Sequence, residues 1–156
     1  MIRLRKLRVY VDTSVFGGVH DDEFTEESKR FFGHVKCGDY IVLLSDETFR
    51  ELDGAPELVK KVLQDLDPKS AELVEIDQEV QQLASAYMSE KILGKASEGD
   101  ALHVAAATVA NADLILSWNF KHIVNYDRIR GFNGVNLKYG YKAMSIISPM
   151  ELDPDE

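Results

Sequence analysis

Short apolar runs alternate with amphipathic stretches along most of the chain. Each apolar run is five or six residues long and is bounded by turn-forming or charged residues. Near-continuous runs of this length are typical of strands in a parallel sheet that helices cover on both faces. The predicted strands are residues 8–12, 40–45, 71–76, 113–117 and 143–148.

The stretches between these runs place apolar residues at helical spacing. Several of them end at a glycine or a proline, which are ordinary helix stops. The predicted helices are residues 25–38, 46–52, 56–66, 77–94 and 97–112.

Two segments show neither pattern clearly. TSVFGG at 13–18 ends in two glycines and is predicted to be a turn. Residues 118–141 contain three glycines and are predicted to be irregular. The alternation elsewhere predicts an α/β fold with a mostly parallel sheet and helices on both faces. We expect a single domain at 1–150 and an acidic tail at 151–156.

The composition indicates the cellular compartment in which the protein is expected to act. Its only cysteine, Cys37, excludes an internal disulfide and suits a reducing cytoplasm. No segment approaches the roughly 18 apolar residues that a membrane helix needs. The basic N-terminal residues are not followed by the long apolar region of a signal peptide. We therefore expect a cytoplasmic protein with no membrane contact.

The formal net charge of −9 argues against a general nucleic-acid binder. The charges are unevenly distributed, however. Residues 1–10 carry four basic side chains and no acid, and residues 114–148 carry five against Asp127 alone. These two basic segments would allow a local phosphate-binding surface despite the negative net charge.

Four polar residues lie where a parallel sheet gathers its ligands, at the carboxyl ends of strands and the helix starts beside them. Three carboxylates that converge there would repel one another unless cations were present. Oxygen ligands of this kind favour Mg²⁺ or Mn²⁺. The candidate residues are Asp12, Glu51, Asp100 and Asn119.

Each candidate has a structural alternative. Asp12 is either a ligand or an N-cap. Asp100 stands three residues after Ser97 and so fits a capping box, although less well than Glu would. Asn119 is able either to bind a metal through its carbonyl oxygen or to cap the next helix.

Periodicity does not choose between Glu51 and Glu47, which lie one turn apart, and we expect one of them to face the strand ends and the other to face solvent.

The histidines favour no metal site of their own. They stand at positions 20, 34, 103 and 122, without the spacing of zinc ligands. His103 lies one turn after Asp100 and is suited to hold a water or a phosphate, but a histidine within ALHVAAA is more often packed in a core. Phosphate-binding loops, nucleophile elbows and zinc motifs are absent from the sequence.

Four motifs together, VDTSV, SDETFREL, GDALHVAAA and ADLILSWNF, resemble those of PIN-domain proteins. The resemblance is to the VapC-like ribonuclease toxins of type II toxin–antitoxin pairs and covers nearly the whole chain. It implies a three-layer α/β/α sandwich around a parallel sheet of about five strands. It also implies a Mg²⁺- or Mn²⁺-dependent ribonuclease that is often a homodimer and is inhibited by a partner antitoxin.

Carried over by motif, the resemblance assigns Asp12, Glu51 and Asp100 as the metal-binding and catalytic acids, and it favours Glu51 over Glu47. The family usually has Asp where this chain has Asn119, although a subgroup with a WN-x-x-H motif carries Asn there. The missing charge implies one firmly held metal and leaves open a second metal, which would arrive, if at all, with substrate. Ser14, Asn119 and a basic residue, Lys121 or His122, are candidates to orient the phosphate of an RNA substrate.

Two other functional hypotheses compete with that of a nuclease. The first is a catalytically weak or inactive PIN-like protein-interaction module, which Asn119 and the acidic surface favour. The second is a Mg²⁺-dependent phosphatase, but Asp12 lacks the second acid two residues on that such enzymes place there.

Overall fold

The computed structural model describes residues 5–94 and 97–152. Its centre is a sheet of five strands in the order β3-β2-β1-β4-β5, and every neighbouring pair is parallel. The central strand β1 aligns Val9 with Val42 on one side and with Leu114 on the other. The strands are β1 (Leu7–Val11), β2 (Tyr40–Ser45), β3 (Ala71–Val74), β4 (Leu114–Leu116) and β5 (Ile146–Ile147).

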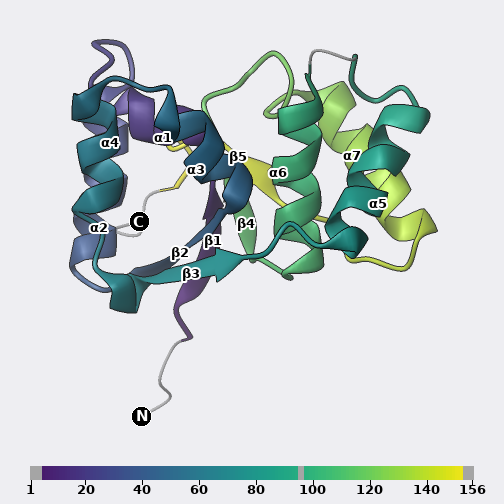
Figure 1. The fold of residues 1–156 in the computed structure, drawn as a ribbon, viewed down its shortest axis with the longest axis horizontal. Coiled ribbons are helices and arrows are strands. Elements are labelled where there is room, and N and C mark those ends of the chain that lie inside the picture. The colour runs from purple at the N-terminus through teal and green to yellow at the C-terminus, as the bar shows by residue number, and fades with distance from the viewer. Residues whose placement is uncertain (1–4, 95–96, 153–156) are drawn as a thin grey trace.

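Helices cover both faces of this sheet (Figure 1). Helices α1, α2 and α4 lie on one face, α5, α6 and α7 lie on the other, and α3 lies near one end of the sheet. Their bounds are α1 (Thr13–Gly18), α2 (Thr25–Lys36), α3 (Asp46–Asp53), α4 (Glu57–Gln64), α5 (Gln78–Ser89), α6 (Glu98–Val109) and α7 (Tyr126–Lys138), with a 3-10 turn η1 at Pro68–Ser70. The predicted three-layer α/β/α architecture is confirmed.

The strands divide the apolar residues between two cores, because successive side chains of a strand point to opposite faces. On β1, Tyr10 joins the core beneath α5, α6 and α7, whereas Val9 and Val11 join the core beneath α1, α2 and α4. This alternation explains why the strands read as continuous apolar runs in the sequence.

Two elements differ from the prediction. Residues 13–18 form the short helix α1 instead of a turn, and residues 126–138 form α7 instead of an irregular segment. Close packing explains one of the glycines that obscured α1. A Cβ at Gly18 would lie 2.5 Å from Ser28 Oγ and 2.7 Å from Trp118 Nε1.

The ends of several elements also differ from the sequence prediction. Strand β5 is confined to two residues and β3 to four, and α5 ends at Ser89 instead of running to Gly94. Residues 153–156 of the predicted acidic tail lie outside the described residues. Within the described part of the chain, no helix combines the length and the apolar character needed to cross a membrane.

Candidate metal centre

The candidate residues come from four elements that meet at the carboxyl end of the sheet. Asp12 follows β1 directly, Glu51 lies on α3 after β2, Asp100 lies in the first turn of α6, and Asn119 follows β4. In Figure 1, α1, α3 and the start of α6 gather at this end of the sheet. The parallel topology therefore brings these distant segments together, as expected for α/β proteins.

Asp12 is buried, with only 5% of its surface exposed. Its Oδ2 atom accepts hydrogen bonds from the hydroxyls of Ser14 (2.6 Å) and Ser117 (2.8 Å). The residue stands at the N-cap position of α1, but its carboxylate makes no capping bond. Its other oxygen, Oδ1, lies 3.7 Å from His103 Nε2. The two serines therefore orient Asp12 so that Oδ1 faces the interior of the cluster.

Glu51 is held from two sides. Thr13 Oγ1 donates a hydrogen bond of 3.0 Å to Glu51 Oε1, and His103 Nε2 forms a short hydrogen bond with the same oxygen. Burial alone would raise the pKa of Glu51, but the hydrogen bond and charge of His103 outweigh it and lower that pKa. The charged form of Glu51 is therefore favoured, and its carboxylate lies in one group with Asp12 and His103.

His103 is fully buried at the centre of this arrangement. Its Nδ1 atom lies 2.7 Å from Tyr10 Oη, which in turn lies 2.7 Å from Ser45 Oγ. Burial alone would lower the pKa of His103. The oxygen of Tyr10, the bond to Glu51 and the carboxylate of Asp12 instead raise that pKa well above its ordinary value.

Asp100 and Asn119 form the adjoining part of the site. Asn119 Nδ2 donates a hydrogen bond of 3.3 Å to Asp100 Oδ1, while Asn119 Oδ1 accepts one of 2.9 Å from the backbone N–H of His122. The carbonyl oxygen of Asn119 is thus engaged in capping a turn, and its amide nitrogen faces Asp100. Burial, followed by the negative charge of Asp12, raises the pKa of Asp100.

The capping-box alternative for Asp100 does not match the structure. Ser97 occupies the N-cap of α6 but makes no side-chain capping bond, and Asp100 is paired with Asn119 instead. Asp100 is accordingly half-buried beside the cluster and feels the charge of Asp12.

The expectation that one of the two α3 glutamates faces solvent is wrong. Glu47 is buried and forms a two-point ion pair with Arg50. It also packs against the start of α6, where a Cβ at Gly99 would lie 2.9 Å from Glu47 Oε1. Glu47 therefore links α3 to α6, and Glu51 is the glutamate that reaches the cluster.

The three candidates for phosphate contact lie in different settings. Ser14 Oγ donates to Asp12 and accepts from the backbone N–H of Trp118. Lys121 is exposed and lines a hollow with Lys91 and Arg128. His122 lies near enough to Asp100 for its charge to lower the pKa of that acid, and its buried Nδ1 has no hydrogen-bond partner among the described residues. Their role toward a phosphate stays a prediction.

The donor atoms fit a divalent cation. Asp12, Glu51 and His103 each offer one ligand atom, and these atoms all lie within 4.8 Å of one another. Two carboxylates and an imidazole are common ligand types for divalent ions. Asp100 is outside this group of three, although the sequence placed it among the ligands. His103 was not predicted as a ligand, and its one signal was a polar residue one turn after Asp100 in an otherwise apolar helix.

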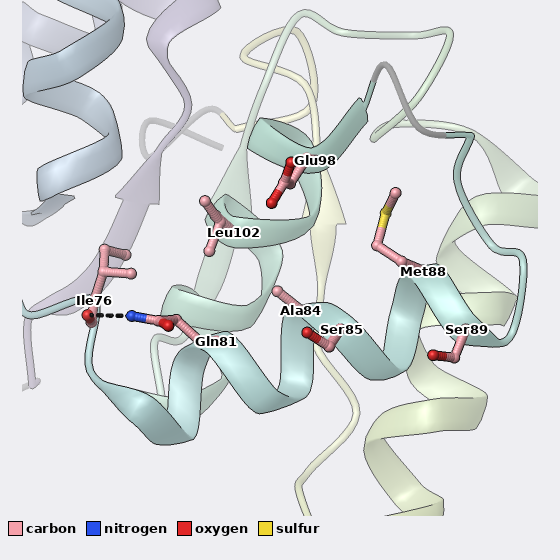
Figure 2. Close-up of a pocket in the computed structure, with 8 residues that line it drawn as sticks. All are labelled: Ile76, Gln81, Ala84, Ser85, Met88, Ser89, Glu98 and Leu102. Atoms are coloured by element: carbon pink, nitrogen blue, oxygen red, sulfur yellow. Dashed lines mark hydrogen bonds between the residues drawn. The ribbon is translucent and has the colours of Figure 1, made fainter.

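A separate hollow of about 570 Å³ lies between α5 and α6 (Figure 2). Apolar side chains such as Ile76, Met88 and Leu102 line it, and Glu98 contributes a carboxylate. The side chain of Gln81 donates to the Ile76 carbonyl at its edge. None of the candidate residues lines this hollow, so the chemistry of the site is confined to the strand ends.

Comparison with protein-family models and with curated proteins finds no match. Two solved structures are similar in fold over nearly the whole chain. VapBC2 from Rickettsia felis, bound to a DNA fragment from its promoter, has a TM-score of 0.56 and 12% identity over 91% of this chain and 98% of that chain. DNA-bound VapBC from Salmonella typhimurium has a TM-score of 0.57 and 13% identity over 92% and 98%. The chain therefore has the fold of a chain in these VapBC complexes, in agreement with its resemblance to the PIN-domain toxins.

Proposed function

We propose that this protein is a divalent-metal-dependent endoribonuclease and the toxin of a toxin–antitoxin pair. The observation that carries the proposal is the convergence of Asp12, Glu51 and His103 at the carboxyl end of the sheet, with Asp100 beside them. Buried carboxylates that face one another repel unless a cation neutralises them. The carboxyl edge of an α/β sheet is the usual place for a ligand site.

The side chains have distinct roles in the proposed site. Asp12 Oδ1 and Glu51 would hold Mg²⁺ or Mn²⁺, while Ser14, Ser117 and Thr13 keep the two carboxylates in place. Bound there, the ion supplies Lewis acidity and lowers the pKa of a coordinated water. Asp100 provides a further carboxylate toward the ion or the attacking water. Asn119 positions Asp100 through its amide, and Lys121 or His122 would contact a phosphate oxygen.

The partner class is part of the proposal. The two similar structures are named as DNA-bound VapBC complexes, which supports a protein antitoxin as partner. RNA as the substrate is proposed from the resemblance of the sequence motifs to those of PIN-domain ribonuclease toxins. A hollow of about 870 Å³ between α2 and α4 is suited to an amphipathic segment, since Phe32, Val62 and Leu66 line it together with Lys29 and Lys61. We further propose that the protein is a homodimer that acts in the cytoplasm.

The second candidate function is a PIN-like interaction module without catalysis. Asn119 favours it, because an amide replaces a carboxylate at this position and its oxygen is engaged by the His122 N–H. Such a module would keep its strand-end acids for folding. Metal-stimulated cleavage separates the two functions.

The test is cleavage of a mixed labelled RNA pool by the purified chain in EDTA, Mg²⁺ or Mn²⁺. Asp12→Asn and Asp100→Asn are assayed beside the wild type, with Asp53→Asn as control because Asp53 is an exposed acid on the same helix as Glu51. Cleavage that requires metal and is lost in Asp12→Asn and Asp100→Asn, but not in Asp53→Asn, is the expected result. A folded wild type that cuts no RNA at millimolar Mn²⁺ would favour the interaction module.

A further inference from the structure

We propose that His103 is a nitrogen ligand of the metal ion, so that the site prefers a first-row transition ion such as Mn²⁺ or Co²⁺ over Mg²⁺. The proposal depends on the metal site at Asp12 and Glu51 in the proposed function. It adds a ligand of a different chemical type, because the candidates from the sequence all offered oxygen. A histidine ligand would change which ion the protein selects.

The position of His103 is the first argument. The ring lies in the middle of α6, fully buried, with Nε2 against the Glu51 carboxylate and 3.7 Å from Asp12 Oδ1. Two ligand atoms that each lie about 2.1 Å from one ion are at most about 4.2 Å apart. The three donor atoms lie within 4.8 Å of one another, so the widest pair would need to approach by at most roughly half an ångström. Nε2 and the Glu51 oxygen, which share a hydrogen bond, would need to move slightly apart to admit the ion.

The support behind the ring is the second argument. A metal-binding histidine usually donates its other N–H to an oxygen, which fixes the ring and its tautomer. His103 has this arrangement, since Nδ1 lies 2.7 Å from Tyr10 Oη. The Tyr10 hydroxyl also lies 2.7 Å from Ser45 Oγ, and if it donates its proton there, its oxygen is able to accept from the ring. Nε2 is thereby held toward the two carboxylates.

The metal-free state and the metal-bound state would differ in the protonation of His103 Nε2. In the structure, Nε2 and the Glu51 carboxylate share a hydrogen bond. Binding of an ion through Nε2 would require that nitrogen to be unprotonated, so any proton on it would be released to solvent. The alternative is that His103 is only an ion-pair partner of Glu51 and never binds the metal.

The chemical types of the ligands determine which ion the site prefers. Mg²⁺ takes oxygen ligands almost exclusively and keeps several of its waters, whereas imidazole binds first-row transition ions well. A site with two carboxylates and one imidazole therefore distinguishes between ions that an all-oxygen site would bind alike. Loss of the imidazole should lower the affinity for Mn²⁺ by about tenfold or more and change that for Mg²⁺ much less.

The experiment uses the metal-free full chain loaded with Mn²⁺ alone. Pulsed electron paramagnetic resonance detects a directly bound histidine nitrogen through its coupling to the Mn²⁺ electron spin. The expected result is a ¹⁴N coupling in the wild type that changes to a ¹⁵N coupling when histidine is isotope-labelled. His103→Gln should lose the coupling, whereas the matched control His122→Gln, a histidine beside Asp100, should keep it.

Titrations of Mn²⁺ and Mg²⁺ into the same proteins complete the test, with circular dichroism as a check on folding. Mn²⁺ binding that is lost in Asp12→Asn but shows no nitrogen coupling, or an unchanged affinity in His103→Gln, would overturn the role of His103 and leave the metal site standing. If the wild type binds no Mn²⁺ at millimolar concentration, both the role of His103 and the proposed metal-dependent function are contradicted. Should His103→Gln not fold, the labelled wild type and His122→Gln still decide the question.

Discussion

Ser117 Oγ donates a hydrogen bond of 2.8 Å to Asp12 Oδ2, although the two residues are 105 positions apart in the chain. The same hydroxyl accepts from the backbone N–H of Asn119. Ser117 thereby connects the acid that follows β1 to the segment that follows β4. The position of Asp12 in the proposed metal site depends on this contact between the two central strands.

Replacement of Ser117 by alanine should weaken metal binding. Residues that hold a metal ligand in place typically contribute 10- to 100-fold to affinity, and Asp12 keeps its bond to Ser14 in the variant, so we expect a loss near tenfold. Titration of Mn²⁺ into Ser117→Ala measures it, with Ser89→Ala, an exposed serine on α5, as control. Equal affinity in Ser117→Ala and the wild type would show that Asp12 does not need this support.

The two glycines that end α1 should respond differently to alanine. Gly18→Ala places a Cβ against Ser28 and the buried Trp118, so we expect it to destabilise the protein by about 1–3 kcal/mol. Gly17→Ala meets nothing within 4 Å and gains helix propensity, so it should be neutral or stabilise by up to about 1 kcal/mol. Urea denaturation of both variants checks this. Equal stabilities would mean that Gly18 is not closely packed.

A buried polar network joins the three helices on one face of the sheet. Tyr87 Oη on α5 donates to Asn136 Oδ1 on α7 at 2.5 Å and lies 3.4 Å from Thr108 Oγ1 on α6. Tyr87→Phe would leave the Asn136 oxygen buried without this donor, which should cost about 1–3 kcal/mol.

The matched control is Tyr126→Phe, because Tyr126 is 75% exposed. Its free energy of unfolding should stay within about 0.5 kcal/mol of the wild type. A Tyr87→Phe variant as stable as Tyr126→Phe would contradict a stabilising role for the network.

Asp113 should make the stability depend on pH. Burial alone would raise its pKa, but hydrogen bonds from Arg5 and from the backbone N–H of Arg8 outweigh burial and lower that pKa. A lowered pKa stabilises the fold above the pKa of the unfolded chain, about 3.9, and the stabilisation is lost as the pH falls through the folded value.

The comparison is between the wild type and Asp113→Asn, which keeps the size and an acceptor oxygen but removes the charge. Denaturant unfolding at pH 7 should show the variant to be less stable. The difference should shrink as the pH falls below about 4, because the wild-type carboxyl group is then protonated too. A difference that stays constant from pH 7 to pH 3 would exclude the charge of Asp113 as its source.

The sheet could be predicted from the sequence because its strands are covered on both faces and read as apolar runs. The runs that include Val9 and Val42 lie within one residue of the observed strands β1 and β2. The order of the strands could not be read from the pattern, since the pairing of Val9 with Leu114 joins residues that local periodicity does not relate.

Glycine explains the helices that the pattern did not predict. Gly131 and Gly134 lie inside α7, and glycine in a helix interior normally argues against that helix. At Gly131 the reason is close packing, because a Cβ there would lie 2.6 Å from Ile92. Tertiary contact of this kind overrides local propensity and leaves no mark in a single sequence.

The sequence proposed the carboxylates of the candidate site but not its centre. Asp12 could be proposed because it directly follows an apolar strand and such strand ends converge in parallel sheets, and Glu51 could be proposed over Glu47 because of the resemblance to PIN-domain proteins. His103 could not, because a histidine in an apolar helix has the same local pattern whether it packs in a core or faces two carboxylates. Only the fold brings Tyr10 to one side of the ring and Glu51 to the other.

The most direct test of the central claim is the chemistry of the RNA ends that the protein leaves. Hydrolysis by a metal-activated water leaves a phosphate monoester on one product and a free hydroxyl on the other, whereas attack by the RNA 2′-hydroxyl leaves a 2′,3′-cyclic phosphate. Mass spectrometry of RNA cut in Mn²⁺ by the wild type and by Asp12→Asn distinguishes the two. We predict monoester ends from the wild type and no such products from Asp12→Asn. Cyclic phosphate ends, or equal cleavage by the variant, would contradict the assignment of Asp12 to a hydrolytic metal centre.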